Sequence, residues 1–244
     1  MPKKQPKPVP GRLYGGESAD ERLARQRQQF MDAGLELFGT IGYRATTVRL
    51  LCRQSGLIDR YFYKNFADTE ALLAAVYRES MDALQAQVMT AVAAAPPDDA
   101  EALIEAGLEA FFVAFENSRM ARVCWLEVLG VSPAIDALYL SNIRRFAQLL
   151  IGLARSLVPN WSVPEDEADI LGVALIGAIS QSAMHWLLGD YRTPRRTLVA
   201  LFTFLFVLDL VFSGFVSYQD ENNQWQVTAH ETIRYYVRTW LIVD

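Results

Sequence analysis

Cysteine and histidine are scarce in this sequence, which has two residues of each among 244. Cys52 and Cys124 lie far apart and neither belongs to a Cys-x-x-Cys pair, so the sequence predicts no disulfide framework, no metal site and no cofactor. Two separated histidines place no base visibly beside a nucleophile, and GxSxG, HExxH, Walker and GxGxxG motifs are missing. We therefore expect a cytoplasmic protein that is not an enzyme.

Glycine and proline are also few, at 14 and 10 residues, whereas hydrophobic residues make up 52% of the chain. This composition excludes a collagenous, low-complexity or wholly disordered protein. Alternating strand patterns are absent, except around 216–227, where a hairpin is the alternative. Helical periodicity predicts an all-α fold instead. The expected helices cover residues 18–38, 47–56, 58–66, 68–95, 101–118, 120–129, 133–158, 165–188 and 193–216, and a last one begins at Thr228.

Positive charge is concentrated in the N-terminal third of an otherwise acidic chain. Residues 1–80 hold 13 Lys and Arg against 9 Asp and Glu, whereas residues 81–244 hold 10 against 19. The excess lies mainly in residues 1–17, where lysines alternate with prolines and no apolar segment resembles a signal peptide. We expect a disordered basic arm there, either simply solvated or in contact with DNA.

Residues 46–66 carry the signals of a helix-turn-helix. Thr47 is expected to cap a short helix that ends near Gly56, and a second short helix follows over 58–66. Phe62 and Phe66, four residues apart, are the expected apolar anchors of that second helix. Its other faces carry polar and aromatic side chains, as a helix that enters the major groove of DNA requires.

The order of signals over residues 28–76 resembles the tetracycline-repressor (TetR) family of bacterial transcription regulators. It comprises Leu-Phe-x-x-x-Gly-Tyr-x-x-Thr-Thr-Val, then Gly56, then Tyr63-x-x-Phe66, then Glu70-Ala-Leu-Leu. The resemblance implies an N-terminal three-helix DNA-binding domain over 18–66. It also implies a C-terminal helical domain over 67–244 that forms a homodimer and encloses a pocket for a small molecule.

The resemblance also implies which residues contact double-stranded DNA. The positions that match the family's contacts are occupied by Thr47, Arg49, Arg60, Tyr61, Tyr63 and Lys64. Two positions depart from the family's pattern, because Ile58 stands where relatives have a capping Ser or Thr, and Thr69 where many have Lys. We expect Asp59 to cap the second helix one residue later.

Aromatic residues gather in the middle helices and suggest a pocket for a small apolar effector. The predicted ligand contacts, aromatic residues with two polar ones, are Phe111, Phe115, Trp125, Phe146, Gln181 and His185. Each aromatic residue is individually more typical of a plain core, and His185 of a core or interface. Cys124 is expected to be a small core residue, with a redox sensor as the alternative.

Residues 198–216 form an apolar run in which Asp209 is the only charge. Its length and hydropathy suit a membrane span, but also a helix buried in a protein. Residues 170–188 carry small side chains that allow close helix approach, so we expect the two segments to form a four-helix dimer interface with a second copy. Membrane association is the less favoured interpretation.

These observations predict a DNA-binding transcriptional regulator. The expected form is a ligand-released repressor that binds a palindromic operator as a homodimer. The alternative, from another class, is a membrane-associated or small-molecule carrier helical protein whose helix-turn-helix no longer reads DNA.

Overall fold

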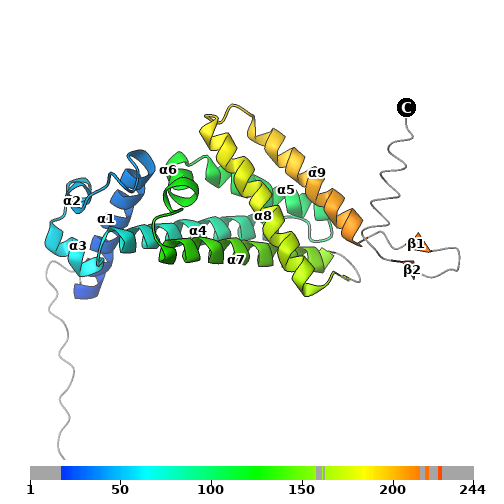
Figure 1. Cartoon of the computed structure of the whole chain (residues 1–244), viewed down its shortest axis with the longest axis horizontal. Coiled ribbons are helices and arrows are strands. Elements are labelled where there is room, and N and C mark those ends of the chain that lie inside the picture. The colour runs from blue at the N-terminus through cyan, green and yellow to red at the C-terminus, as the bar shows by residue number, and fades with distance from the viewer. Residues whose placement is uncertain (1–17, 158–160, 162, 215–217, 220–224, 227–244) are drawn as a thin grey trace, which may run out of the picture. The chain divides into compact units, whose positions relative to one another are not determined.

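The computed structural model (Figure 1) describes residues 18–157, 161, 163–214, 218–219 and 225–226. The basic arm and the helix expected from Thr228 lie outside these residues. Within them the structure is helical, apart from two antiparallel two-residue strands, β1 (Tyr218–Gln219) and β2 (Trp225–Gln226). The prediction of an all-α fold is therefore confirmed, and the short strands fall where a hairpin was the alternative.

Contacts divide the chain into two compact units, Met1–Glu79 and Ser80–Asp244. The boundary lies inside a single helix, α4 (Thr69–Ala94), which contributes its first turns to one unit and its later turns to the other. Each unit has its own buried core.

The N-terminal unit is a three-helix arrangement closed by the start of α4. It contains α1 (Ala19–Thr40), α2 (Val48–Ser55) and α3 (Asp59–Asn65). Ser18 and Glu21 form the expected capping box at the start of α1, and Gly42, with a φ of 90°, follows its end. The helices meet around fully buried side chains, which are Phe30, Phe38, Leu51, Phe62, Leu72 and Leu73.

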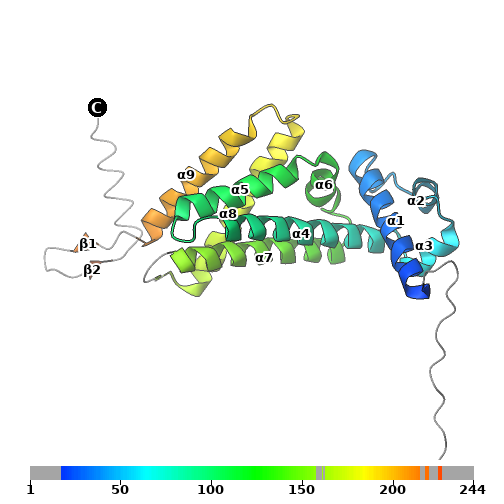
Figure 2. The same ribbon diagram turned by 180° about the vertical axis from the view of Figure 1, so that it is seen from behind.

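The second unit contains the later turns of α4 together with α5 (Ala100–Phe115), α6 (Ser118–Arg122), η1 (Val123–Glu127), α7 (Pro133–Leu157), α8 (Glu165–Leu188) and α9 (Arg195–Gly214). Both views show α4 and α7 side by side (Figures 1 and 2). Helix α8 packs on α7, and α9 packs on α5. Gly172 allows the close approach of α8, because a Cβ there would lie 2.9 Å from Ile151 and 3.2 Å from the Cβ of Ala147.

The segment around Trp125 differs from the expected single helix over 120–129. The chain forms one short α-helical stretch, α6, and then a π-helical turn, η1, with Trp125 at its centre. Such turns are often found at functional sites. Sequence periodicity does not distinguish a π-helical turn from an α-helix, so this feature is visible only in the structure.

Among the residues that the structure describes, α8 is the one helix long and apolar enough to cross a membrane, and 33% of its most apolar window is buried. Helices of this composition also occur in the cores and interfaces of globular proteins. The apolar run at 198–216 falls mainly in α9, whose Val199, Phe202 and Phe206 are buried. Packing on α5 accounts for that part of the run.

Candidate functional site

Helix α2 begins and ends as its sequence dictates. The Thr47 hydroxyl accepts a hydrogen bond from the Leu50 backbone N–H at 3.3 Å, which caps the helix. Gly56 ends it in the left-handed region, with a φ of 71°, and nothing lies within 4 Å of where its Cβ would stand. The sequence thus fixes a short helix followed by a sharp turn.

Helix α3 is held by two aromatic anchors. Phe62 is fully buried and meets the Phe30 ring edge-on at a centroid distance of 5.3 Å. Phe66, which follows the helix, lies beneath the Arg27 guanidinium at 4.4 Å, and Arg27 also donates to the Asn65 carbonyl at 3.1 Å. These contacts fix one face of α3 against α1 and leave its opposite face open.

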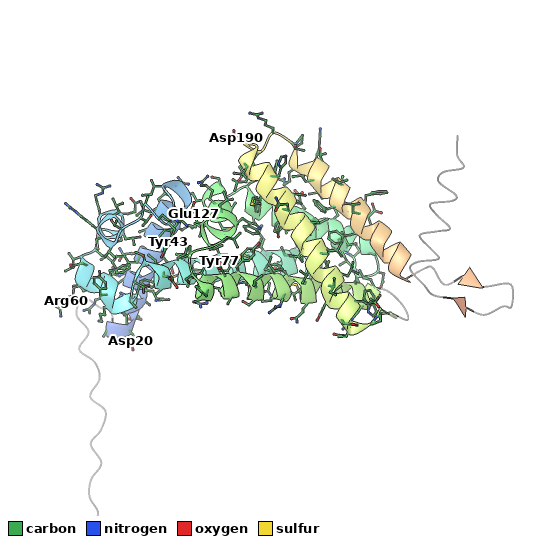
Figure 3. The ribbon with its side chains drawn as sticks, in the orientation of Figure 1. Asp20, Tyr43, Arg60, Tyr77, Glu127 and Asp190 are labelled. Carbon is green, nitrogen blue, oxygen red and sulfur yellow. The ribbon has the colours of Figure 1, made fainter. Side chains whose placement is uncertain are left out.

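All six predicted DNA contacts are exposed on α2 and α3 or at their ends: Thr47, Arg49, Arg60, Tyr61, Tyr63 and Lys64. Tyr63 is 60% exposed although its neighbour Phe62 is fully buried. Figure 3 labels Arg60 at the outer edge of α3. Within the described part of the chain, no carboxylate forms an ion pair with Arg49, Arg60 or Lys64, so their charges are available to phosphates or bases.

The start of α3 differs from the expected cap. Ile58 is the N-cap residue and makes no side-chain hydrogen bond, while Asp59 is the first helical residue. The Asp59 carboxylate accepts from the neighbouring Arg60 N–H at 2.8 Å instead of from the N–H groups further along. Asp59 therefore does not replace the missing capping hydroxyl. Asp68, by contrast, accepts from the Ala71 N–H at 2.7 Å and supports the start of α4.

A cavity of about 390 Å³ lies inside the second unit. Helices α4, α5, α7, α8, α9 and the η1 turn all contribute to its wall. The lining is almost entirely aliphatic or aromatic, and its side chains with polar groups are Gln85, Gln148, Ser180 and Trp125. A wall of this kind suits an apolar small molecule.

Three of the six predicted ligand contacts line this cavity: Phe111, Trp125 and Phe146. Phe115 lies outside the lining and is fully buried against Trp125, at a ring distance of 4.8 Å. Gln181 and His185 also lie outside it, because the exposed side of α8 carries them. Sequence reasoning missed the α4 contribution, although Met81, Val88 and Val92 recur there at helical spacing.

Cys124 is a core residue beside this cavity's aromatic wall. It is 1% exposed, and burial raises the pKa of its thiol to about 12. At neutral pH the thiol is almost entirely protonated and unreactive, which disfavours the redox-sensor alternative.

An exposed basic and aromatic recognition surface on a helix-turn-helix, together with an apolar cavity in a second helical unit, defines a DNA-binding regulator with a compartment for a small molecule. Comparison with known proteins agrees. A family model described as bacterial regulatory proteins, tetR family, matches residues 30–76. The HTH-type transcriptional regulator BetI of Escherichia coli K12 is 26% identical over 158 residues, which cover 63% of this chain and 78% of that protein. The chain is therefore similar to TetR-family transcriptional regulators, in its N-terminal helices by the family model and over most of its length by BetI.

Solved structures share the fold. The fatty acid degradation regulator FadR of Bacillus halodurans matches with a TM-score of 0.64 and 17% sequence identity. The match covers 74% of this chain and 93% of that protein. FadR of Bacillus subtilis, solved in complex with stearoyl-CoA, matches with a TM-score of 0.64 and 19% sequence identity. That match covers 74% of this chain and 97% of the FadR chain. TetR-family proteins are generally transcriptional regulators and not enzymes, and they act as DNA-binding dimers with small-molecule effectors.

Proposed function

We propose that this protein is a cytoplasmic homodimeric repressor that leaves a palindromic operator when a small apolar effector fills the cavity. The observation that carries the proposal is that a single helix, α4, contributes residues to both structural units. Its first turns supply Leu72, Leu73 and Val76 to the core of the N-terminal unit, and its later turns supply Met81 and Leu84 to the cavity wall. One helix thus takes part in both structures.

Operator recognition is assigned to the exposed face of α3 and the start of α2. Arg60 has the fork geometry to donate two hydrogen bonds to guanine O6 and N7 in the major groove. Lys64 and Tyr63 suit phosphate oxygens, and Thr47 and Arg49 extend the contact at the start of α2. Two copies related by a twofold axis would read two half-sites about one helical turn apart.

Replacing Arg60 and Lys64 separately by Ala tests this division of roles. Arg60→Ala should cost about 1–3 kcal/mol on the best operator and relax its sequence preference, because base readout is lost. Lys64→Ala should weaken binding similarly on all sequences and flatten the salt dependence by about one unit, because one phosphate contact is lost. Anisotropy titrations over several salt concentrations measure both effects. Parent-like binding by both variants would show that α3 does not read the DNA.

The dimer is assigned to the outer faces of α8 and α9. Large apolar side chains are exposed there: Ile170, Val173, Leu188, Leu201, Phe204 and Leu205. Small residues, Ala174, Gly177 and Ala178, lie on the same exposed face of α8. An apolar surface built from two long helices is typical of a protein interface, and a second copy presents the same surface in twofold symmetry. A second copy of the chain on this surface would also explain the apolar character of α8 and α9, which suggested a membrane span.

The size and chemistry of the cavity support one class of effector. An apolar cavity of about 150 Å³ accommodates benzene, so about 390 Å³ corresponds to roughly 16 carbon atoms. The lining residues Met81 and Val92 are separated by eleven residues along α4, or about 16 Å. An elongated apolar wall favours a long acyl chain over a compact polar ligand, and the structural relative bound to stearoyl-CoA supports that class.

Release of the operator follows from linkage. An effector that prefers the conformation with poorly spaced recognition helices weakens operator binding by the same factor by which DNA weakens effector binding. A tenfold coupling requires that the effector bind one conformation about 1.4 kcal/mol more tightly than the other.

A further inference from the structure

The cavity reaches the protein surface between α4 and α7. Most of its lining is buried or half-buried, but Met89 on α4 is 44% exposed, and Gln148 and Gly152 on α7 are also exposed. Gln85 and Met89 lie one turn apart on α4, as do Gln148 and Gly152 on α7. Nothing lies within 4 Å of where a Gly152 Cβ would stand, so this position leaves the seam open.

One ion pair joins the two helices on the same seam. Arg145 Nη1 lies 2.7 Å from Asp82 Oδ1, and the two residues come three positions before Gln148 and Gln85 respectively. The Arg145 guanidinium carbon is 5.8 Å from the centre of the Phe146 ring, which lines the cavity. Figures 1 and 2 both show α4 and α7 running beside each other. Arg145 is not part of the cavity lining, but it lies on α7 directly before Phe146 and about one turn before Gln148, which both line it.

Only some of the hydrogen-bond donors of the Arg145 guanidinium have an acceptor. Asp82 engages Nη1, but Nε and Nη2 are shielded from solvent and have no acceptor among the described residues. Buried donors without an acceptor destabilise a protein, and those that persist in a structure call for an explanation, such as a bound group that completes them. Because Nε and Nη2 are shielded, a ligand oxygen would accept from them only after the Arg145 side chain, which is 37% exposed, turns toward the opening.

We infer that Arg145 recognises the polar end of the effector, whose apolar chain passes beside Gly152 into the cavity. The inference rests on the proposed apolar effector and deepens it to one chemistry: an acyl chain with an oxygen acceptor at its first carbon. A free carboxylate and a thioester carbonyl share that chemistry. Arg145 is charged, so its hydrogen bonds to either acceptor are charge-assisted, but only a carboxylate adds an opposite charge and a second oxygen for a bidentate pair. A carboxylate should therefore depend on Arg145 more than a thioester does.

The test measures binding of three 16-carbon probes, hexadecanoate, hexadecanoyl-CoA and hexadecanol, to the full-length protein and to two variants. Arg145→Met keeps the aliphatic stem and removes the donors, whereas Asp82→Asn breaks the ion pair and leaves the donors in place. Arg145→Met should weaken hexadecanoate binding at least about tenfold, and hexadecanol binding much less. Asp82→Asn should leave hexadecanoate affinity within about twofold of the parent, because only an exposed pair is lost.

The outcomes separate the possible roles of Arg145. The acyl probe that the parent binds more tightly, and whose affinity falls in Arg145→Met, identifies the natural head group. Equal losses for Arg145→Met and Asp82→Asn on all three probes would show that Arg145 only joins α7 to α4, and would overturn the inference. Equal binding by the parent and Arg145→Met would overturn it as well, while leaving the apolar effector in place. If the parent bound none of the probes, the acyl effector and this inference would both fail.

The opening itself is tested at Gly152. Gly152→Leu should slow hexadecanol association, because a branched side chain would stand in the seam, while Gly152→Ala serves as the control for helix propensity. Equal association rates for both variants and the parent would place the route to the cavity elsewhere and would overturn that part of the inference.

Discussion

Replacing Phe204 by Arg is expected to convert the dimer into a monomer and to remove operator binding. Phe204 is 62% exposed in the single chain and lies in the apolar surface of α8 and α9. A second copy would bury it, and a charge buried at a twofold interface would face its own symmetry mate without a partner. A protein that engages one half-site instead of two loses about 10²–10⁴ in apparent affinity. Ala178→Arg, on the exposed side of α8, should act in the same way.

A matched control distinguishes the interface from a general effect of surface charge. Val113 on α5 is also apolar and 38% exposed, but it lies outside the α8 and α9 surface. Val113→Arg should therefore remain dimeric and bind the operator normally. Sedimentation velocity and anisotropy measure the two properties. A parent protein that sediments as a stable monomer, or a dimeric Phe204→Arg variant, would contradict the assigned interface.

Truncating Phe62 to Ala is expected to destabilise the N-terminal unit by about 3–5 kcal/mol. Phe62 is fully buried and contacts both Phe30 and Phe66, so its loss leaves a cavity between α1 and α3. That cost is a large fraction of the total stability of a typical domain, about 5–15 kcal/mol. Operator binding should fall with the folded fraction, because α3 would no longer be held in place.

Urea unfolding, followed by circular dichroism, measures this loss. Phe62→Leu is the control, because it retains most of the apolar volume and should cost much less than the truncation. The cavity in the second unit should still bind hexadecanol in both variants. Similar stability of Phe62→Ala and the parent would mean that α3 is not anchored as the structure indicates.

The sequence was most informative where its signals are local. Thr47, Gly56 and Phe62 each act on the few residues around them, so a cap, a turn and an anchor identify the helix-turn-helix without knowledge of the rest of the fold. The bounds expected for α8, 165–188, also match the structure, because a proline precedes the helix and a glycine follows it.

The cavity was harder to predict because it depends on distant helices. Helix α8 is apolar on several sides, so periodicity did not show that Gln181 and His185 face outward. Phe115 and Phe111 lie one turn apart on α5, yet Phe111 lines the cavity and Phe115 lies behind Trp125. The unpaired donors of Arg145 have no signature in the sequence, since they follow from the packing of α7 beside α4.

Operator release by an acyl ligand is the most direct test of the central claim. An operator selected from random duplexes by the purified protein is labelled, and its anisotropy is followed as hexadecanoate or hexadecanoyl-CoA is added. We predict a loss of operator affinity of at least about fivefold, which is the lower end of typical allosteric coupling. Sugars or nucleotides of similar concentration should have no effect. Selective release by those polar molecules, with no response to either acyl compound, would contradict the account of the cavity as the effector site.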